Sequence, residues 1–276
     1  MKVRIKFQKY GAMKFIGHLD VMRYFQKAFR RANIDNELSK GFNPHQIMSF
    51  AAPLGVGLTS DGEYLDAQLL SSDDPDTMIN RMNAVMTEGF RVIGFRHLLD
   101  PEENKKVITA MSLVASADYL VSLKDGYEIG NGFRIKEFQN AWLRFLSEKE
   151  IIVDKKTKTS EKAVDIRPMI TLTAFREEEY KDKLKEVIRQ ESITVPASVA
   201  VVKEVKSVAD VYENGIKVYL QLDTGSASNL KPELVMEAFY DYIGLPYEKF
   251  AWQVHRIETY TRDENGKQIS LDQLER

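Results

Sequence analysis

Four side chains in the first quarter of the sequence carry groups that can transfer protons. His18 and Asp20 lie in the segment GHLD, His45 ends the segment GFNPH, and Glu63 follows in DGEYLD. A histidine titrates near neutral pH and a carboxylate can orient it, so these groups could act as acid and base, or hold a metal ion, if the fold brings them together. The alternative is structural: Asp20 stabilises a helix start, and the histidines shape loops. The candidate catalytic residues are therefore His18, Asp20 and His45, and no metal ligand set is assigned.

Cationic side chains recur at helical spacing in the same region and could hold phosphate groups. Arg23, Lys27 and Arg30 are three and four residues apart, so they share one face of a helix. Such contacts position a nucleic acid without reading its sequence. The alternative is a solvated helix face on which Asp20 pairs with Arg23, which contributes only about 0.3–0.5 kcal/mol. The predicted nucleic-acid-binding residues are Lys14, Arg23, Lys27, Arg30, Arg31, Lys40 and Asn43.

The charge of the chain is unevenly distributed along the sequence. The formal net charge is −2, yet residues 1–50 carry ten Lys or Arg against three Asp or Glu, a net charge of +7. A local positive surface on an otherwise acidic protein indicates an anion-facing surface. The alternative is a basic face that contacts only solvent.

Cysteine is absent from the 276-residue sequence. This excludes disulfides, thiolate-held zinc, iron–sulfur clusters and cysteine nucleophiles in this chain. The glycines of GVGLTSDG match neither a dinucleotide fingerprint nor a P-loop, so no cofactor is predicted. No apolar run approaches the roughly 20 residues that span a bilayer, and the charged N-terminus is unlike a signal peptide. We therefore expect a soluble, cytoplasmic protein without a membrane partner.

The pattern of the first hundred residues is typical of the ferredoxin-like fold, in which strand, helix, two strands, helix and strand follow one another. The predicted elements are a strand at 3–7, a helix at 18–32, extended segments at 37–52 and 63–70, a helix after Asp74 and a strand at 90–95. Helices cover one face of such a sheet. The other face, which would carry Arg4 and Lys6, is expected to be free for binding.

The second half repeats this order with insertions. The predicted elements are a strand-like segment at 107–123, a helix at 134–148, extended segments at 151–157 and 162–175, a charged helix at 177–190, a strand at 216–222, a helix at 229–243 and a strand at 250–260. Phe138, Trp142 and Phe145 lie on one stripe of the helix at 134–148. The sequence thus predicts an α+β fold of two ferredoxin-like domains in tandem, with antiparallel sheets and helices on one face. The domains would be 1–100, with a basic face, and 107–262.

The most distinctive segments of the chain resemble the radical-SAM-associated proteins of unknown function. The matching pieces are Gly17-His18-Leu19-Asp20, Arg23, Arg30-Arg31, Gly41-Phe42-Asn43-Pro44-His45, Pro53-Leu54-Gly55, Glu63-Tyr64, Asp165-Ile166-Arg167-Pro168 and Asn229-Leu230-Lys231-Pro232. The resemblance covers most of the chain and is strongest over residues 9–70. Fused members carry iron–sulfur cysteines that this chain lacks. The resemblance therefore implies a stand-alone accessory part with a radical SAM enzyme as its partner.

Three functional hypotheses follow. The preferred one is a non-catalytic accessory module that binds RNA or a ribonucleoprotein substrate for a partner radical SAM enzyme. The second is an RNA-processing or RNA-modifying enzyme that uses His18, Asp20 and His45. The third is a protein-only scaffold for the radical SAM partner.

Overall fold

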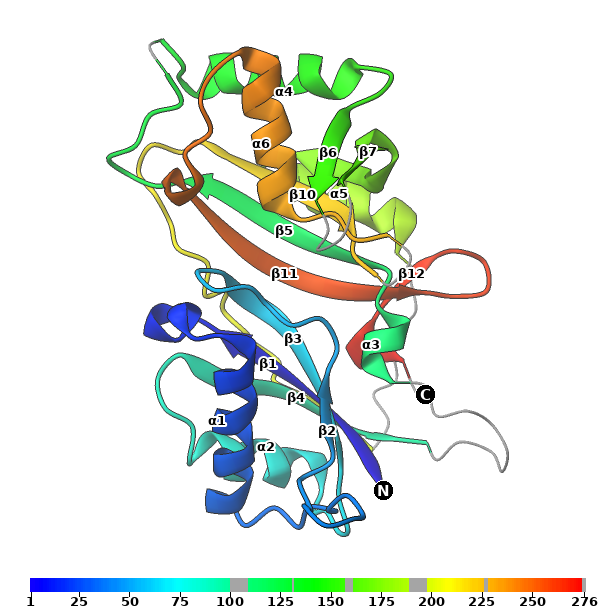
Figure 1. Cartoon of the computed structure of the whole chain (residues 1–276). Coiled ribbons are helices and arrows are strands. Elements are labelled where there is room, and N and C mark those ends of the chain that lie inside the picture. The colour runs from blue at the N-terminus through cyan, green and yellow to red at the C-terminus, as the bar shows by residue number, and fades with distance from the viewer. Residues whose placement is uncertain (100–108, 131, 157–160, 189–197, 226–227, 275–276) are drawn as a thin grey trace. The chain divides into compact units, whose positions relative to one another are not determined.

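The computed structural model (Figure 1) divides into two compact units. The structure describes residues 1–99, 109–130, 132–156, 161–188, 198–225 and 228–274. The first unit groups Met1–Ala115, Ile188–Ala209 and Arg256–Arg276, and the second groups Ser116–Val187 and Asp210–His255. The domains 1–100 and 107–262 stay a prediction, because a grouping by contacts does not test which segments fold on their own.

The first unit begins with the predicted order of strand, helix, two strands, helix and strand. Its elements are β1 (Lys2–Lys9), α1 (His18–Arg31), β2 (Met48–Phe50), β3 (Thr59–Gln68), α2 (Pro75–Asn83) and β4 (Phe90–Leu98). The strand β1 is central and antiparallel to both neighbours, since Ile5 lies opposite Leu65 of β3 and Phe95 of β4. The short β2 pairs antiparallel with the outer side of β3, which gives the spatial order β2-β3-β1-β4.

Further short elements complete this unit. They are the 3-10 helix η1 (Gly11–Phe15), α3 (Ala110–Leu113), β9 (Val199–Val201), β12 (Gln268–Ser270), the 3-10 helix η4 (Leu271–Gln273) and residues 256–262 of β11 (Trp252–Arg262). The strand β9 pairs with β4 and β12 pairs with β11. The prediction that residues 107–123 are strand-like is partly wrong. Residues 110–113 form the helix α3, and the strand begins at Ser116. Residues 107–108 lie outside the described residues.

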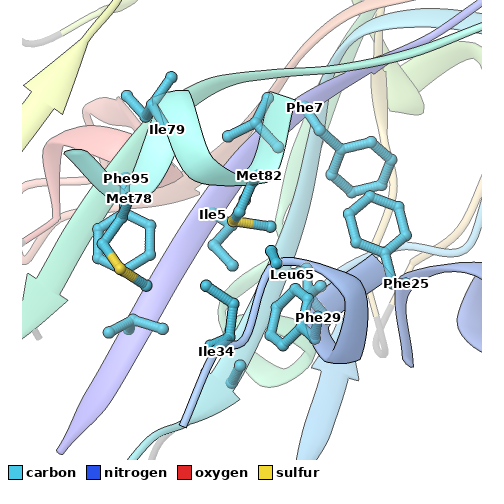
Figure 2. Packing of buried hydrophobic residues seen from close by; sticks show 14 of the residues in the cluster. Ile5, Phe7, Phe25, Phe29, Ile34, Leu65, Met78, Ile79, Met82 and Phe95 are labelled. Atoms are coloured by element: carbon cyan, nitrogen blue, oxygen red, sulfur yellow. The ribbon is translucent and has the colours of Figure 1, made fainter. Parts of the chain in front are cut away.

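Both α1 and α2 pack on one face of the first sheet (Figure 2). Alternation along β1 directs Val3, Ile5 and Phe7 to this face, where each is at most 1% exposed. The rings of Phe7 and Phe25 lie 4.6 Å apart between β1 and α1. This packing fixes which side of α1 faces outward.

The opposite face of β1 is buried, so the expectation of a free basic face carrying Arg4 and Lys6 is wrong. Arg4 is 1% exposed and binds Asp66 through two hydrogen bonds of 2.8 and 3.0 Å. It also donates to the carbonyl of Leu271 in η4, while the amide of Ala110 in α3 donates to Asp66. The segments η4 and α3 therefore cover this face and supply partners for its charges.

The second unit has its own sheet and aromatic core. Its elements are β5 (Ser116–Leu123), α4 (Ile135–Ser147), β6 (Ile152–Lys156), β7 (Glu161–Asp165), the 3-10 helix η2 (Arg167–Met169), β8 (Ile170–Ala174), α5 (Glu177–Val187), β10 (Lys217–Asp223), α6 (Pro232–Ile243), the 3-10 helix η3 (Lys249–Ala251) and the start of β11. The strand β10 is antiparallel to both β5 and β8, and β6 pairs antiparallel with β7. The predicted stripe of Phe138, Trp142 and Phe145 is confirmed as core, and the Trp142 ring lies 5.1 Å from that of Phe239 in α6.

The chain is thus a mixed α+β protein whose strands are mostly antiparallel. Six α-helices lie in the described ranges. In those ranges, no helix combines the length and apolar character that crossing a membrane requires.

Candidate functional site

The outward face of α1 presents a stripe of cations. Val21, Phe25, Ala28 and Phe29 are buried against the sheet, because apolar residues at this spacing share one side of a helix. The opposite side exposes the three predicted cations Arg23, Lys27 and Arg30. Packing of the core therefore determines that these cations face solvent.

Few acidic groups neutralise this stripe. Arg23 lies 3.2 Å from Asp20, but their side chains are 67% and 61% exposed, so solvent screens the pair. Within the described part of the chain, Lys27 and Arg30 make no ion pair. Arg31 donates to the carbonyl of Val85 and lies over the ring of Tyr24. The helix therefore keeps a net positive outer face.

Exposed aromatic rings accompany cations before and after α1. Phe15 precedes the helix, is 66% exposed and has the ammonium of Lys14 5.5 Å from its ring centre. Phe42 is fully exposed in the loop that follows the helix, two residues after the exposed Lys40. The predicted Asn43 is exposed beside it. Sequence reasoning missed both rings, although each stands within two residues of a lysine.

The two candidate histidines are not brought together. The ring of His18 packs edge-on against Phe50, with 5.1 Å between ring centres. His45 lies in the exposed loop, where its Nδ1 is 2.8 Å from the hydroxyl of Ser39. Five residues of largely extended chain separate His45 from Phe50, about 16 Å at roughly 3.3 Å per residue. Over the described residues, no group of three possible metal ligands is assembled.

His18 instead faces a different set of titratable groups, which the sequence identified only in part. Glu63 and Arg256 form a buried ion pair at 2.9 Å, and Arg256 also donates to the carbonyl of Ala52. Lys9 is buried nearby and donates to the carbonyl of Ile16. Burial lowers the pKa of both Lys9 and His18, and the negative charge of Glu63 partly opposes the effect on each pKa. The lowered pKa favours the uncharged imidazole of His18, and the Glu63 carboxylate favours the charged form.

A second buried charge cluster joins β1 to the end of the chain. The Lys6 side chain is 13% exposed, and its ammonium lies 2.5 Å from Glu258 and 3.0 Å from Asp272. The hydroxyl of Tyr64 donates to Glu258 at 2.7 Å. Burial alone would lower the pKa of Lys6, but the two carboxylates outweigh it and hold this pKa well above its usual range. Burial raises the pKa of Glu258 to about 7, against the opposing charge of Lys6. Sequence reasoning missed this cluster entirely.

The Lys6 cluster has no room for a substrate. The cavity beside it, lined among others by Lys6, Tyr64, Arg96 and Asp272, has a volume of about 10 Å³. Such a volume accommodates about one water molecule. The Lys6 cluster is therefore part of the packed interior of the first unit.

Glu258→Gln is expected to flatten the pH dependence of stability between about pH 4.5 and 7. The folded-state pKa of Glu258, about 7, lies above its ordinary value of 4.5, so the folded state binds a proton that the unfolded chain releases. The stability that this proton provides is complete below pH 4.5 and is lost as the pH rises through 7, at no more than about 1.4 kcal/mol per pH unit. Urea unfolding of both proteins at pH 4.5, 5.5, 7 and 8 measures the difference. An unchanged slope in the variant would contradict the assignment, and the exposed Glu264→Gln is the control.

The fold and the site define a broad class of protein, and one family model matches most of the chain. That class is an α+β protein in which the outer face of one helix is positive and exposed aromatic rings precede and follow this helix in the sequence. In the described residues, no group of possible metal ligands is assembled. Residues 2–232 match the family described as uncharacterized protein conserved in bacteria (DUF2344), and the chain belongs to that family. No curated protein matches the chain. The resemblance to radical-SAM-associated proteins is therefore supported as membership of a family of unknown function, and the radical SAM association stays a prediction.

Proposed function

We propose that the chain is a non-catalytic accessory module that binds single-stranded RNA, or a ribonucleoprotein, along the outer face of α1. The observation that carries this proposal is the exposed Phe15 ring beside Lys14, followed by the cations Arg23, Lys27 and Arg30. Exposed aromatic rings stack on unpaired bases, and neighbouring cations contact the phosphates. The 14-residue helix is about 21 Å long, so it can contact several successive nucleotides.

Single-stranded RNA fits this surface better than a duplex does. Stacking requires bases that are free of their own neighbours, as in loops and single strands. An exposed ring such as Phe15 or Phe42 stacks most readily on unpaired bases, whereas phosphate contacts dominate on a duplex. The sheet is not the proposed platform, since Arg4 and Lys6 are engaged by Asp66, Glu258 and Asp272.

We further infer that both units are ferredoxin-like. The spatial order β2-β3-β1-β4 in the first unit and the order β8-β10-β5-β11 in the second support this inference. In each unit the first strand along the chain is flanked by the third and the fourth, as a split βαβ arrangement requires. The RNA-binding surface then lies on the helix layer of the first unit.

RNA binding by this surface is expected to weaken steeply with salt. Each phosphate contact to a single strand contributes a slope of about −0.7 in a plot of log affinity against log salt. Four contacts would therefore weaken binding about 50-fold between 50 and 200 mM salt. Fluorescence anisotropy with a labelled 12-nucleotide RNA measures this, and a 12-base-pair RNA duplex is the comparison. Absence of binding to the single strand at 50 mM salt would overturn the proposal.

A radical SAM enzyme is the proposed partner, on the resemblance described above. Co-purification of the two proteins with and without nuclease separates an RNA-bridged assembly from a protein-only scaffold. The catalytic alternative is less well supported, because His18 begins α1 whereas His45 lies in the exposed loop after that helix, and Asp20 pairs with Arg23.

A further inference from the structure

A groove in the second unit lies against the ends of α4 and α6 and the start of β6. Its volume is about 710 Å³, far more than a single water occupies. The apolar part of its surface includes Ile152, 57% exposed, and Tyr242, 41% exposed. The rings of Phe145 and Tyr242 lie 5.6 Å apart and bring the last turns of the two helices together. The groove therefore offers exposed apolar contact area beside two helix ends.

Every charged residue that lines the groove is acidic. Its charged lining residues are Glu148, Glu150, Asp154, Glu237 and Asp241. All five side chains are exposed, and none of them makes an ion pair with any residue that the structure describes. The nearest lysines in sequence are Lys149, which does not line the groove, and Lys155, whose ammonium donates to the carbonyl of Asn229. Five carboxylates thus surround the apolar area without a cation among the lining residues.

The backbone adds to this negative potential. The carbonyl end of a helix carries a partial negative charge, which basic residues in the last turn usually offset. The last turn of α6 contains no basic residue, and that of α4 contains only Arg144. Since Phe145 and Tyr242 are in contact, the negative ends of both helices lie at the groove. An anionic ligand such as RNA is therefore disfavoured here.

We propose that this groove binds a basic, partly apolar peptide segment of a partner protein. Arginine or lysine side chains would pair with the carboxylates and lie over the exposed ring of Tyr242, and apolar side chains would cover Ile152. Among the described residues β6 pairs with β7 alone, so its other edge offers backbone groups to an extended segment. This surface is independent of the proposed RNA-binding surface on the first unit.

The test uses a labelled ten-residue peptide that alternates arginine with leucine, and a matched peptide with glutamate in place of arginine. Fluorescence anisotropy measures the binding of each peptide to the full chain. The groove variant is Glu148→Lys/Glu237→Lys/Asp241→Lys, which reverses three charges on exposed side chains. The arginine peptide is expected to bind this variant on the order of tenfold more weakly than the unmodified chain.

A control variant makes the same change of charge elsewhere. Glu128, Glu213 and Glu264 are exposed and lie outside the groove, so their replacement by lysine is expected to leave peptide binding nearly unchanged. A second groove variant, Ile152→Ser/Tyr242→Ser, keeps every carboxylate and removes apolar contact area. It is also expected to weaken binding on the order of tenfold.

Circular dichroism on each variant establishes that the fold is retained. Equal loss of binding in the groove and control variants would overturn the proposal, because net charge alone would then explain the binding. Equal binding of the glutamate and arginine peptides would overturn it as well. Displacement of the arginine peptide by spermidine at matched charge would assign the groove to small polycations instead of a protein segment.

Discussion

Lys6→Met is expected to destabilise the protein by about 3–5 kcal/mol at neutral pH, the range for removing one partner of a buried ion pair. The substitution leaves Glu258 and Asp272 facing each other without the ammonium that both carboxylates bind. Two buried carboxylates without a cation repel one another, so at least one must take up a proton. The loss is therefore expected to shrink as the pH falls toward 5. Urea unfolding at pH 5 and pH 7.5 measures both the loss and its pH dependence.

Two comparisons isolate the buried cluster in this experiment. Lys203→Met removes an exposed lysine of the same unit and is expected to change stability by less than about 0.5 kcal/mol. The double variant Lys6→Met/Glu258→Gln removes one of the two orphaned charges, so it is expected to recover part of the loss. A Lys6→Met protein as stable as its Lys203→Met counterpart would show that the cluster contributes nothing.

The buried cluster also shows what sequence patterns could not predict. Alternation along β1 identified the strand and the inward set of Val3, Ile5 and Phe7. The same alternation assigned Arg4 and Lys6 to solvent, because a polar side chain facing water and one facing a buried partner follow the same period. Their partners Asp66, Glu258 and Asp272 are 62 to 266 residues away in the chain. Only the return of the C-terminal segment to the first unit creates the cluster.

The candidate site was predictable where it rests on one helix and not where it depends on loops. The cations of α1 follow from helical periodicity, since the buried face of Val21, Phe25 and Phe29 leaves Arg23 and Lys27 outside. The distance between His18 and His45 depends on the course of residues 33–47, which no periodicity determines. The Glu63 carboxylate acts on the pKa of His18, and Glu63 lies opposite Phe7 in the β1–β3 pairing. A register of this kind is set by the whole sheet rather than by local sequence.

Replacing Arg23, Lys27 and Arg30 together by glutamate is expected to weaken binding of single-stranded RNA on the order of 100-fold at 50 mM salt, because three phosphate contacts become three repulsions. The slope of log affinity against log salt is expected to fall by about 2, at roughly 0.7 per lost contact. The fold should survive, since all three side chains are exposed and only Arg23 has a carboxylate partner in the described chain. Circular dichroism and urea unfolding verify this before anisotropy is measured.

The matched control reverses three exposed lysines of the second unit, Lys136, Lys162 and Lys231, and changes the net charge by the same amount. If α1 carries the RNA-binding surface, this control keeps most of its affinity, because none of its three lysines makes one of the proposed phosphate contacts. Equal weakening in both triple variants would instead mean that RNA senses only the total charge of the protein. In that case α1 would be an ordinary solvated helix face.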